Sequence, residues 1–134
     1  MPPKEELARG WLVKAQRDLE MANRALEEEP RLPDMACFHS HQTIEKALKA
    51  VLLYRGIQAP RTHVLDTLLK LCGPIDPRFD LLAPQLSLMT EFAVEGRYPD
   101  TGCEPNLDEA REALRLAREA YDIIVSALPT EVLP

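Results

Sequence analysis

The stretch FHSHQTIEKALKAVLLYRG, residues 38–56, combines an apolar helical stripe with many polar side chains. Ile44, Leu48 and Val51 recur at spacings of four and three, which places them on one face of a helix. Two histidines, a glutamine, a glutamate and two lysines are interleaved with this stripe. The stretch therefore predicts a core helix, and it raises the question of whether its polar side chains form a site or a solvated surface.

The rest of the chain repeats the helical pattern, and Gly and Pro residues separate the segments. The stripe of the fourth segment contains Phe92 and is interrupted by Pro84, where we expect an irregular helix. No segment shows the alternation that is typical of a strand. The predicted helices cover about residues 4–28, 34–56, 63–71, 76–95 and 106–128.

Several residues predict where these helices begin and end. Asp34 is suited to the N-cap of the second helix, and Gly56 to the position just after its last turn. Asn106 with Glu109 three residues later has the spacing of a capping box. Long amphipathic helices joined by short loops pack as antiparallel bundles. We therefore expect an all-α fold, an up-and-down four-helix bundle with an additional short helix, in a single domain over residues 1–134.

Composition limits the function classes. The chain has 134 residues, 46% hydrophobic and 28% charged, as in an ordinary globular domain. Its net charge of −6 argues against a uniformly basic nucleic-acid surface, although a local basic patch remains compatible with it. Cys37, Cys72 and Cys103 form no Cys-x-x-Cys pair, which favours reduced thiols. Because neither a membrane span nor a signal peptide is recognisable, we expect a cytoplasmic protein.

The polar residues of the second helix follow two neighbouring strips. His39, Gln42, Lys46 and Lys49 share one side of the helix, and Glu45 on the adjacent strip is four residues from Lys49. The simplest interpretation is a solvated face with Glu45–Lys49 pairing. His39 and a second histidine, two residues later, point about 200° apart on a helix and cannot share a metal ion. We therefore expect neither a metal site nor a bound cofactor.

A phosphate or RNA site is the other interpretation of these cations. Arg61, His63 and Arg97 lie in segments that can meet Lys46 and Lys49 at one end of a bundle. An imidazole can transfer protons while a guanidinium stabilises the charge of a phosphate in metal-independent phosphodiester cleavage. His63, Arg61 and Arg97 are therefore the candidate catalytic residues. Glycine-rich phosphate loops are missing from the sequence.

Four sequence patterns together resemble HEPN domains, the higher eukaryotes and prokaryotes nucleotide-binding domain family, over about residues 8–125. Trp11-Leu12-Val13-Lys14-Ala15 followed by Asp18-Leu19 and Ala22 resembles the first helix of that family. Cys37-Phe38-His39, Gln42 and Glu45-Lys46-Ala47-Leu48-Lys49-Ala50 resemble the second helix. Arg61-Thr62-His63 with Leu65, and Arg97-Tyr98-Pro99, resemble the start of the next helix and the motif after the fourth.

The resemblance implies an all-α bundle that forms a homodimer and pairs with a minimal nucleotidyltransferase-like protein in a two-gene toxin–antitoxin system. Many HEPN toxins are metal-independent ribonucleases with an Arg and a His about four to six residues apart. Here seven residues stand between Arg31 and His39, seven between Arg55 and His63, and one between Arg61 and His63. The ribonuclease motif is therefore absent.

The resemblance then favours a protein that binds a partner, and a nucleotide, through the polar face of the second helix. A diverged metal-independent ribonuclease toxin that acts on RNA and a plain dimerising helical module are the alternatives. Tyr98 can stack on a base, and the cations can hold phosphate. The candidate nucleotide-binding residues are His39, Gln42, Lys46, Lys49, Arg61, His63, Arg97 and Tyr98.

Overall fold

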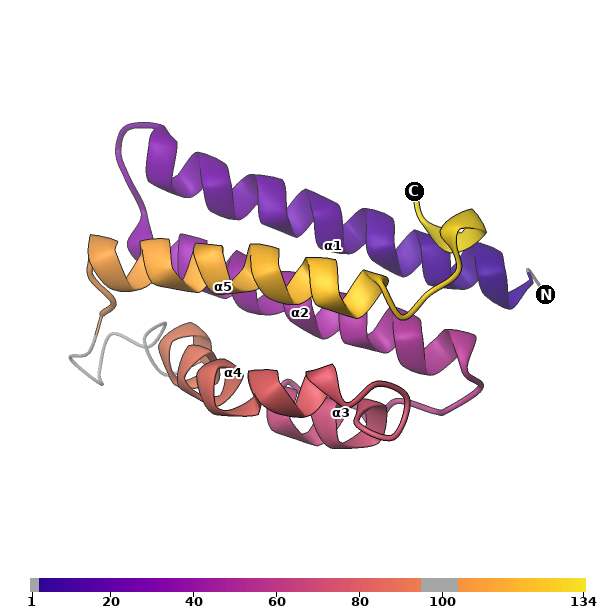
Figure 1. The fold of residues 1–134 in the computed structure, drawn as a ribbon. Helices are drawn as coiled ribbons and strands as arrows, with labels where there is room; N and C mark the ends of the chain where they lie inside the picture. The colour runs from indigo at the N-terminus through magenta and orange to yellow at the C-terminus, as the bar shows by residue number, and fades with distance from the viewer. Residues whose placement is uncertain (1–2, 95–103) are drawn as a thin grey trace.

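The structure, a computed structural model, describes residues 3–94 and 104–134, and these residues form only helices, turns and loops (Figure 1). The prediction of an all-α bundle with one additional short helix is confirmed. Within the described ranges the elements are α1 (Lys4–Glu27), α2 (Pro33–Tyr54), α3 (Leu65–Cys72), α4 (Arg78–Val94), α5 (Leu107–Val125) and the short 3₁₀ helix η3 (Thr130–Val132).

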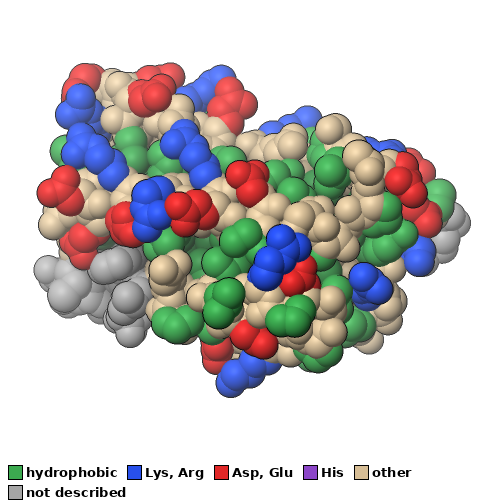
Figure 2. All heavy atoms as spheres, viewed as in Figure 1, with side chains coloured by type: hydrophobic (Ala, Val, Ile, Leu, Met, Phe, Trp, Pro, Cys, Tyr) green, Lys and Arg blue, Asp and Glu red, His purple; other side chains and the backbone are tan. Residues whose placement is uncertain are grey.

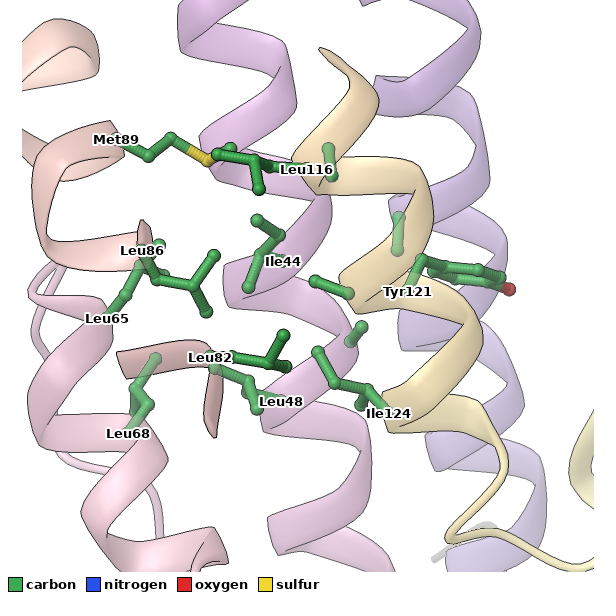
Figure 3. Packing of buried hydrophobic residues seen from close by; sticks show 14 of the residues in the cluster. Ile44, Leu48, Leu65, Leu68, Leu82, Leu86, Met89, Leu116, Tyr121 and Ile124 are labelled. Carbon is green, nitrogen blue, oxygen red and sulfur yellow. The ribbon is translucent and has the colours of Figure 1, made fainter. Parts of the chain in front are cut away.

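Helix α2 lies at the centre of the bundle and contacts each of the other four α-helices. It packs most extensively along α1, while α3 and α4 lie on the side of α2 away from α1 (Figure 1). Ile44, Leu48 and Val51 are fully buried, as their spacing predicts. Figure 3 shows Ile44 and Leu48 between leucines of α3 and α4 on one side and Ile124 of α5 on the other. The predicted core helix is therefore the helix that every other helix covers.

The two ends of α2 differ in how well the sequence predicts them. The prediction that Asp34 is the N-cap is wrong, because the helix begins at Pro33 and Asp34 lies in its first turn. Proline suits the first helical position, since it lacks the N–H that would be unpaired there. The prediction for Gly56 is confirmed by its φ of 73°. The N–H groups of Gly56 and Ile57 donate to the carbonyls of Leu53 at 3.1 Å and Leu52 at 2.9 Å, which is a Schellman motif.

The remaining helix ends agree with the sequence in part. Asn106 and Glu109 form the expected capping box at the start of α5. Helix α4 runs through Pro84 without interruption. Phe79, near its start, is fully buried and was not part of the predicted apolar stripe. The side chain of Phe92 lies outside the described part of the chain. Within that part, no helix is both long and apolar enough to cross a membrane.

Two of the cysteines are core residues. Cys37 and Cys72 are buried free thiols. Burial raises the pKa of each thiol to about 12, and at Cys37 the charges of Glu109 and Asp34 act in the same direction. Such thiols stay protonated at neutral pH and belong to the packing of the bundle. Cys103 lies outside the described residues.

Candidate functional site

A buried carboxylate on α1 binds two cationic side chains of α2. Asp18 is 8% exposed, and its Oδ1 lies 2.8 Å from Nδ1 of His39. Its other oxygen, Oδ2, accepts a hydrogen bond from Nζ of Lys46 at 2.5 Å. His39 and Lys46 are seven residues apart, or two helical turns, so both reach the same side of α2. We call these three residues the Asp18 cluster.

The Asp18 cluster is neutralised internally. Burial alone raises the pKa of Asp18, but hydrogen bonds from His39 and Lys46 and their charges outweigh it, and the pKa lies below its usual value. Asp18 is therefore ionised at neutral pH. Because an ionised carboxylate only accepts hydrogen bonds, Nδ1 of His39 carries the proton of that bond. The cluster is an ion network that joins α1 to α2.

Small, buried side chains flank this cluster on both helices. Ala15 and Ala22 stand three residues before and four after Asp18, and both are fully buried. On α2, Ala36 lies three residues before His39 and Ala50 lies four residues after Lys46, and both alanines are also fully buried. Side chains at these spacings share a helix face. The α1–α2 contact at the Asp18 cluster is therefore flanked by alanines on both helices.

A second carboxylate, on α2 itself, also binds one lysine and one histidine. Oε1 of Glu45 lies 2.8 Å from Nδ1 of His63, and Oε2 accepts a hydrogen bond from Nζ of Lys49 at 3.2 Å. The Glu45 side chain is 4% exposed, whereas that of His63 is 73% exposed. The Schellman motif after α2 turns the chain back, so that the loop before α3 brings His63 to the middle of α2. We call Glu45, Lys49 and His63 the Glu45 cluster.

A buried histidine lies beside the Glu45 cluster. His41 is 1% exposed, and within the described residues its Nε2 has no hydrogen-bond partner. Burial lowers the pKa of His41, and the charge of Glu45 and a hydrogen bond with the backbone of His63 oppose this effect without cancelling it. The imidazole is therefore neutral at pH 7. His39 and His41 are not a pair, which agrees with the helical spacing.

The Glu45 cluster borders a groove between α1, the end of α2 and the loop that follows. The groove has a volume of about 540 Å³. Nζ of Lys49 lies 5.9 Å from the centroid of the Trp11 ring, and Arg61 stands at the loop side. Within residues 3–94 and 104–134, Arg61 has no carboxylate partner. We call this cavity the Trp11 groove; it is lined by Trp11, Lys49, Leu53, Gly56, Ile57, Gln58, Ala59, Pro60 and Arg61.

The structure separates the candidate residues into two groups. Lys49, Arg61 and His63 come together around the Trp11 groove and the Glu45 cluster. His39 and Lys46 are instead bound to the carboxylate on α1. Gln42 is half-buried on α2. Arg97 and Tyr98 lie outside the described residues.

Two residues of these clusters and two residues beside them were not among the sequence candidates. Asp18 follows Ala15 by three residues and precedes Ala22 by four, so an acid within a buried stripe was a usable signal. Glu45 was assigned to the solvated strip, and Trp11 to the apolar stripe of its helix. His41 was placed on the same strip as Glu45 and Lys49 and was recognised as pointing away from His39. Their burial depends on which helices pack around α2, and spacing along one helix does not carry that information.

The surface chemistry elsewhere is mixed. Basic and acidic side chains are interspersed over α1 and α5 on the face shown in Figure 2, and no described histidine is visible there. Arg115, for example, pairs with both Glu112 and Glu119 on α5. Within the described ranges, no group of three or more His, Cys, Asp or Glu side chains is arranged to hold a metal ion. The groove with its two cations is therefore the most distinctive site.

Known proteins resemble this chain over nearly its whole length. The family model of the HEPN domain matches residues 8–128. The protein named "Putative toxin MJ1304" from Methanocaldococcus jannaschii is 29% identical, in an alignment that covers 87% of this chain and 85% of that protein. The crystal structure of TT1696 from Thermus thermophilus is similar with a TM-score of 0.78 and 31% identity, over 92% of this chain and 99% of that one. On the fold, the sequence patterns and these matches, the chain belongs to the HEPN domain family.

Proposed function

We propose that this chain is the HEPN component of a two-gene toxin–antitoxin pair, that it forms a homodimer, and that it binds a minimal nucleotidyltransferase-like partner. Family membership supports this proposal, as does similarity to a protein whose name includes the word toxin. In the same proposal the chain binds a nucleotide on the surface around the C-terminal half of α2.

The observation that carries the nucleotide-binding part is the gathering of cationic groups at one open site. Lys49 and Arg61 line the Trp11 groove, and the exposed imidazole of His63 is tied to the same glutamate as Lys49. Cations of this kind form charge-assisted hydrogen bonds with phosphate oxygens. In an acidic chain this gathering is a local basic feature, which is what a small phosphorylated ligand requires.

We propose a structural role for the two candidates that belong to the Asp18 cluster. His39 and Lys46 are both bound to the buried carboxylate of Asp18 on α1, and neither lines the Trp11 groove. A phosphate that recruited Lys46 would have to remove it from Asp18 and leave a buried charge partly unpaired, which is costly. We therefore assign binding to Lys49, Arg61 and His63, and structural support to His39 and Lys46.

Calorimetric titration of the purified protein with AMP, ATP, GTP and a short RNA tests nucleotide binding. We expect saturable binding of at least one nucleotide and a loss of affinity in Arg61→Ala. The control Arg111→Ala, on the exposed face of α5, should bind like the wild type, because Arg111 pairs only with Asp108 among the described residues. If none of the ligands binds, the nucleotide-binding part of the proposal is wrong.

Partner binding requires a separate experiment. Co-expression with the product of the neighbouring gene, followed by purification through a tag on that product, should recover the complex when the neighbour encodes a nucleotidyltransferase-like protein. Size-exclusion chromatography with light scattering on the chain alone should give the mass of a dimer. A neighbour of unrelated type, or a monomer at micromolar concentration, would contradict these parts of the proposal.

A metal-independent ribonuclease is a second candidate function, and the Glu45–His63 contact favours it. A buried carboxylate that accepts a hydrogen bond from Nδ1 fixes the orientation and the tautomer of an imidazole. The exposed His63 ring is thus positioned as a general acid or base, with Arg61 two residues away to support the phosphate.

Incubation of the protein with total RNA in EDTA tests this second candidate. Cleavage should be present in the wild type, nearly abolished in His63→Ala, and retained in His39→Ala after correction for folded fraction. Absence of cleavage at high protein concentration would exclude the activity, and cleavage undiminished by His63→Ala would assign it to another site or to a contaminant.

A further inference from the structure

We propose that the Trp11 groove binds a nucleoside monophosphate, with its base on the indole of Trp11 and its phosphate between Lys49 and Arg61. This inference rests on the proposed nucleotide binding and extends it by naming the site, the ligand class and a residue, Trp11, that neither the spacing nor the polar-face argument selected.

The position of Trp11 suits a stacking surface. It is half-buried on α1, packed against the core on one side and lining the groove on another. A planar base stacks favourably on such an aromatic side chain, whatever its hydrogen-bonding pattern. Nζ of Lys49 lies over the ring at 5.9 Å from its centroid, at the outer limit of a cation–π contact, so a base that stacks there displaces a weakly held ammonium.

The two cations of the groove differ in how they are held. Lys49 donates to Glu45 at 3.2 Å, a longer contact than the 2.8 Å between Glu45 and His63. Glu45 therefore keeps its hydrogen bond from Nδ1 of His63 when Lys49 turns toward a phosphate. Arg61 is exposed on the loop, and its guanidinium can bind two phosphate oxygens at once.

Charge and size favour a monophosphate. A phosphomonoester carries about −1.5 to −2 charges at pH 7, which Lys49 and Arg61 can balance. A longer phosphate chain would bring further negative charge to a protein of net charge −6. The volume of about 540 Å³ lies within the range of pockets for small ligands. The remaining lining is largely apolar, with Leu53, Ile57, Ala59 and Pro60 around the amide of Gln58.

The sequence supplies a reporter for the test, because Trp11 is the single tryptophan of the chain. We expect AMP to change the tryptophan emission saturably. Adenosine lacks the phosphate and ribose 5-phosphate lacks the base, so each should bind at least about tenfold more weakly. ATP should bind no better than AMP. Ligand binding by the variants is followed by calorimetry, with circular dichroism to verify folding.

Four variants separate the parts of the site. Arg61→Ala, Lys49→Met and Trp11→Leu should each weaken AMP binding about tenfold, and Arg111→Ala should not change it. If calorimetry detects AMP binding while tryptophan emission is unchanged and Arg61→Ala binds normally, the nucleotide site lies elsewhere. That result overturns this inference and leaves nucleotide binding intact.

Two further outcomes are decisive. If Trp11→Leu binds AMP as tightly as the wild type, or ribose 5-phosphate binds as tightly as AMP, the base does not lie on the indole and the inference is wrong. If no nucleotide binds at all in the wild type, both the proposed nucleotide binding and this inference are wrong.

Discussion

The two carboxylate clusters around α2 have a similar composition and differ in the exposure of their histidines. Each contains one buried acid, one lysine and one histidine. In the Asp18 cluster the histidine side chain is 19% exposed, and in the Glu45 cluster it is 73% exposed. The first joins two helices, whereas the second joins a helix to a loop beside a groove. Lys46 and Lys49, on neighbouring turns of α2, thus have different roles because their acids lie on different helices.

This comparison predicts different consequences of mutation at the two sites. Removal of a group from the Asp18 cluster should cost stability. Removal of the exposed histidine or of a groove residue should weaken ligand binding and should change the free energy of unfolding only slightly. The following experiments examine that difference, beginning with the largest expected effect.

Asp18→Asn should lower the free energy of unfolding by about 3 kcal/mol, because it leaves His39 and Lys46 without a counter-charge in a largely buried place. Urea denaturation followed by circular dichroism measures the change. Asp108→Asn is the control, since the Asp108 side chain is 93% exposed and its loss should cost less than about 0.5 kcal/mol. Equal losses in the two variants would mean that the Asp18 cluster is not a structural network.

The contribution of Asp18 should disappear in acid. Its folded-state pKa lies below the value of an unfolded chain, so the stabilisation is fully present above about pH 4 and is lost as the pH falls through the folded-state pKa. The difference in unfolding free energy between wild type and Asp18→Asn should therefore narrow as the pH falls below about 4, on the order of 1.4 kcal/mol per pH unit at most. A constant difference across this range would contradict the lowered pKa.

Beside the Glu45 cluster, pH acts in a higher window through His41. Its folded-state pKa is below that of an unfolded histidine, so its neutral form contributes stability above about pH 6.5 that is lost as the pH falls through the folded-state pKa. Thermal unfolding between pH 7.5 and 5.5 should show decreasing stability in the wild type and a flatter profile in His41→Gln. Identical slopes would indicate that His41 does not titrate in this way.

The smallest expected stability effect is at His63. Because the side chain is 73% exposed and Glu45 keeps Lys49, His63→Ala should cost no more than about 0.5 kcal/mol. His39→Ala should cost about 1.5 kcal/mol, because it removes a hydrogen bond from a buried charge. Parallel urea denaturation of the two variants gives the comparison. A larger loss for His63→Ala would reverse the roles assigned to the clusters.

The sequence predicted the parts of this structure that depend on local chemistry. The capping box of Asn106 and the turn at Gly56 are formed by neighbouring residues, so their patterns were sufficient. The family patterns identified the HEPN domain, and the helical stripes identified the core of α2. At the start of α2, Asp34 is a favourable N-cap and Pro33 is a favourable first helical residue. The helix begins at Pro33.

The clusters could not be predicted in the same way. Whether Lys46 faces solvent or a carboxylate depends on the placement of α1, which lies 28 residues away along the chain at Asp18. Glu45 has the spacing of an exposed helix pair with Lys49, yet the returning loop covers it with His63. Spacing along α2 therefore identified the polar residues. Which of them bind the carboxylate on α1 and which lie beside the groove is determined by tertiary packing.

The alanines beside Asp18 have a consequence for how this protein can change over evolutionary time. Aspartate has the shortest acidic side chain, and it reaches from α1 to α2 where Ala15 and Ala22 leave the helices close together. A larger residue at either alanine would push the helices apart, since a packed interior has little spare volume. Ala15 and Ala22 carry no reactive group, yet few substitutions should be tolerated there. Their small volume keeps Asp18 within reach of His39 and Lys46.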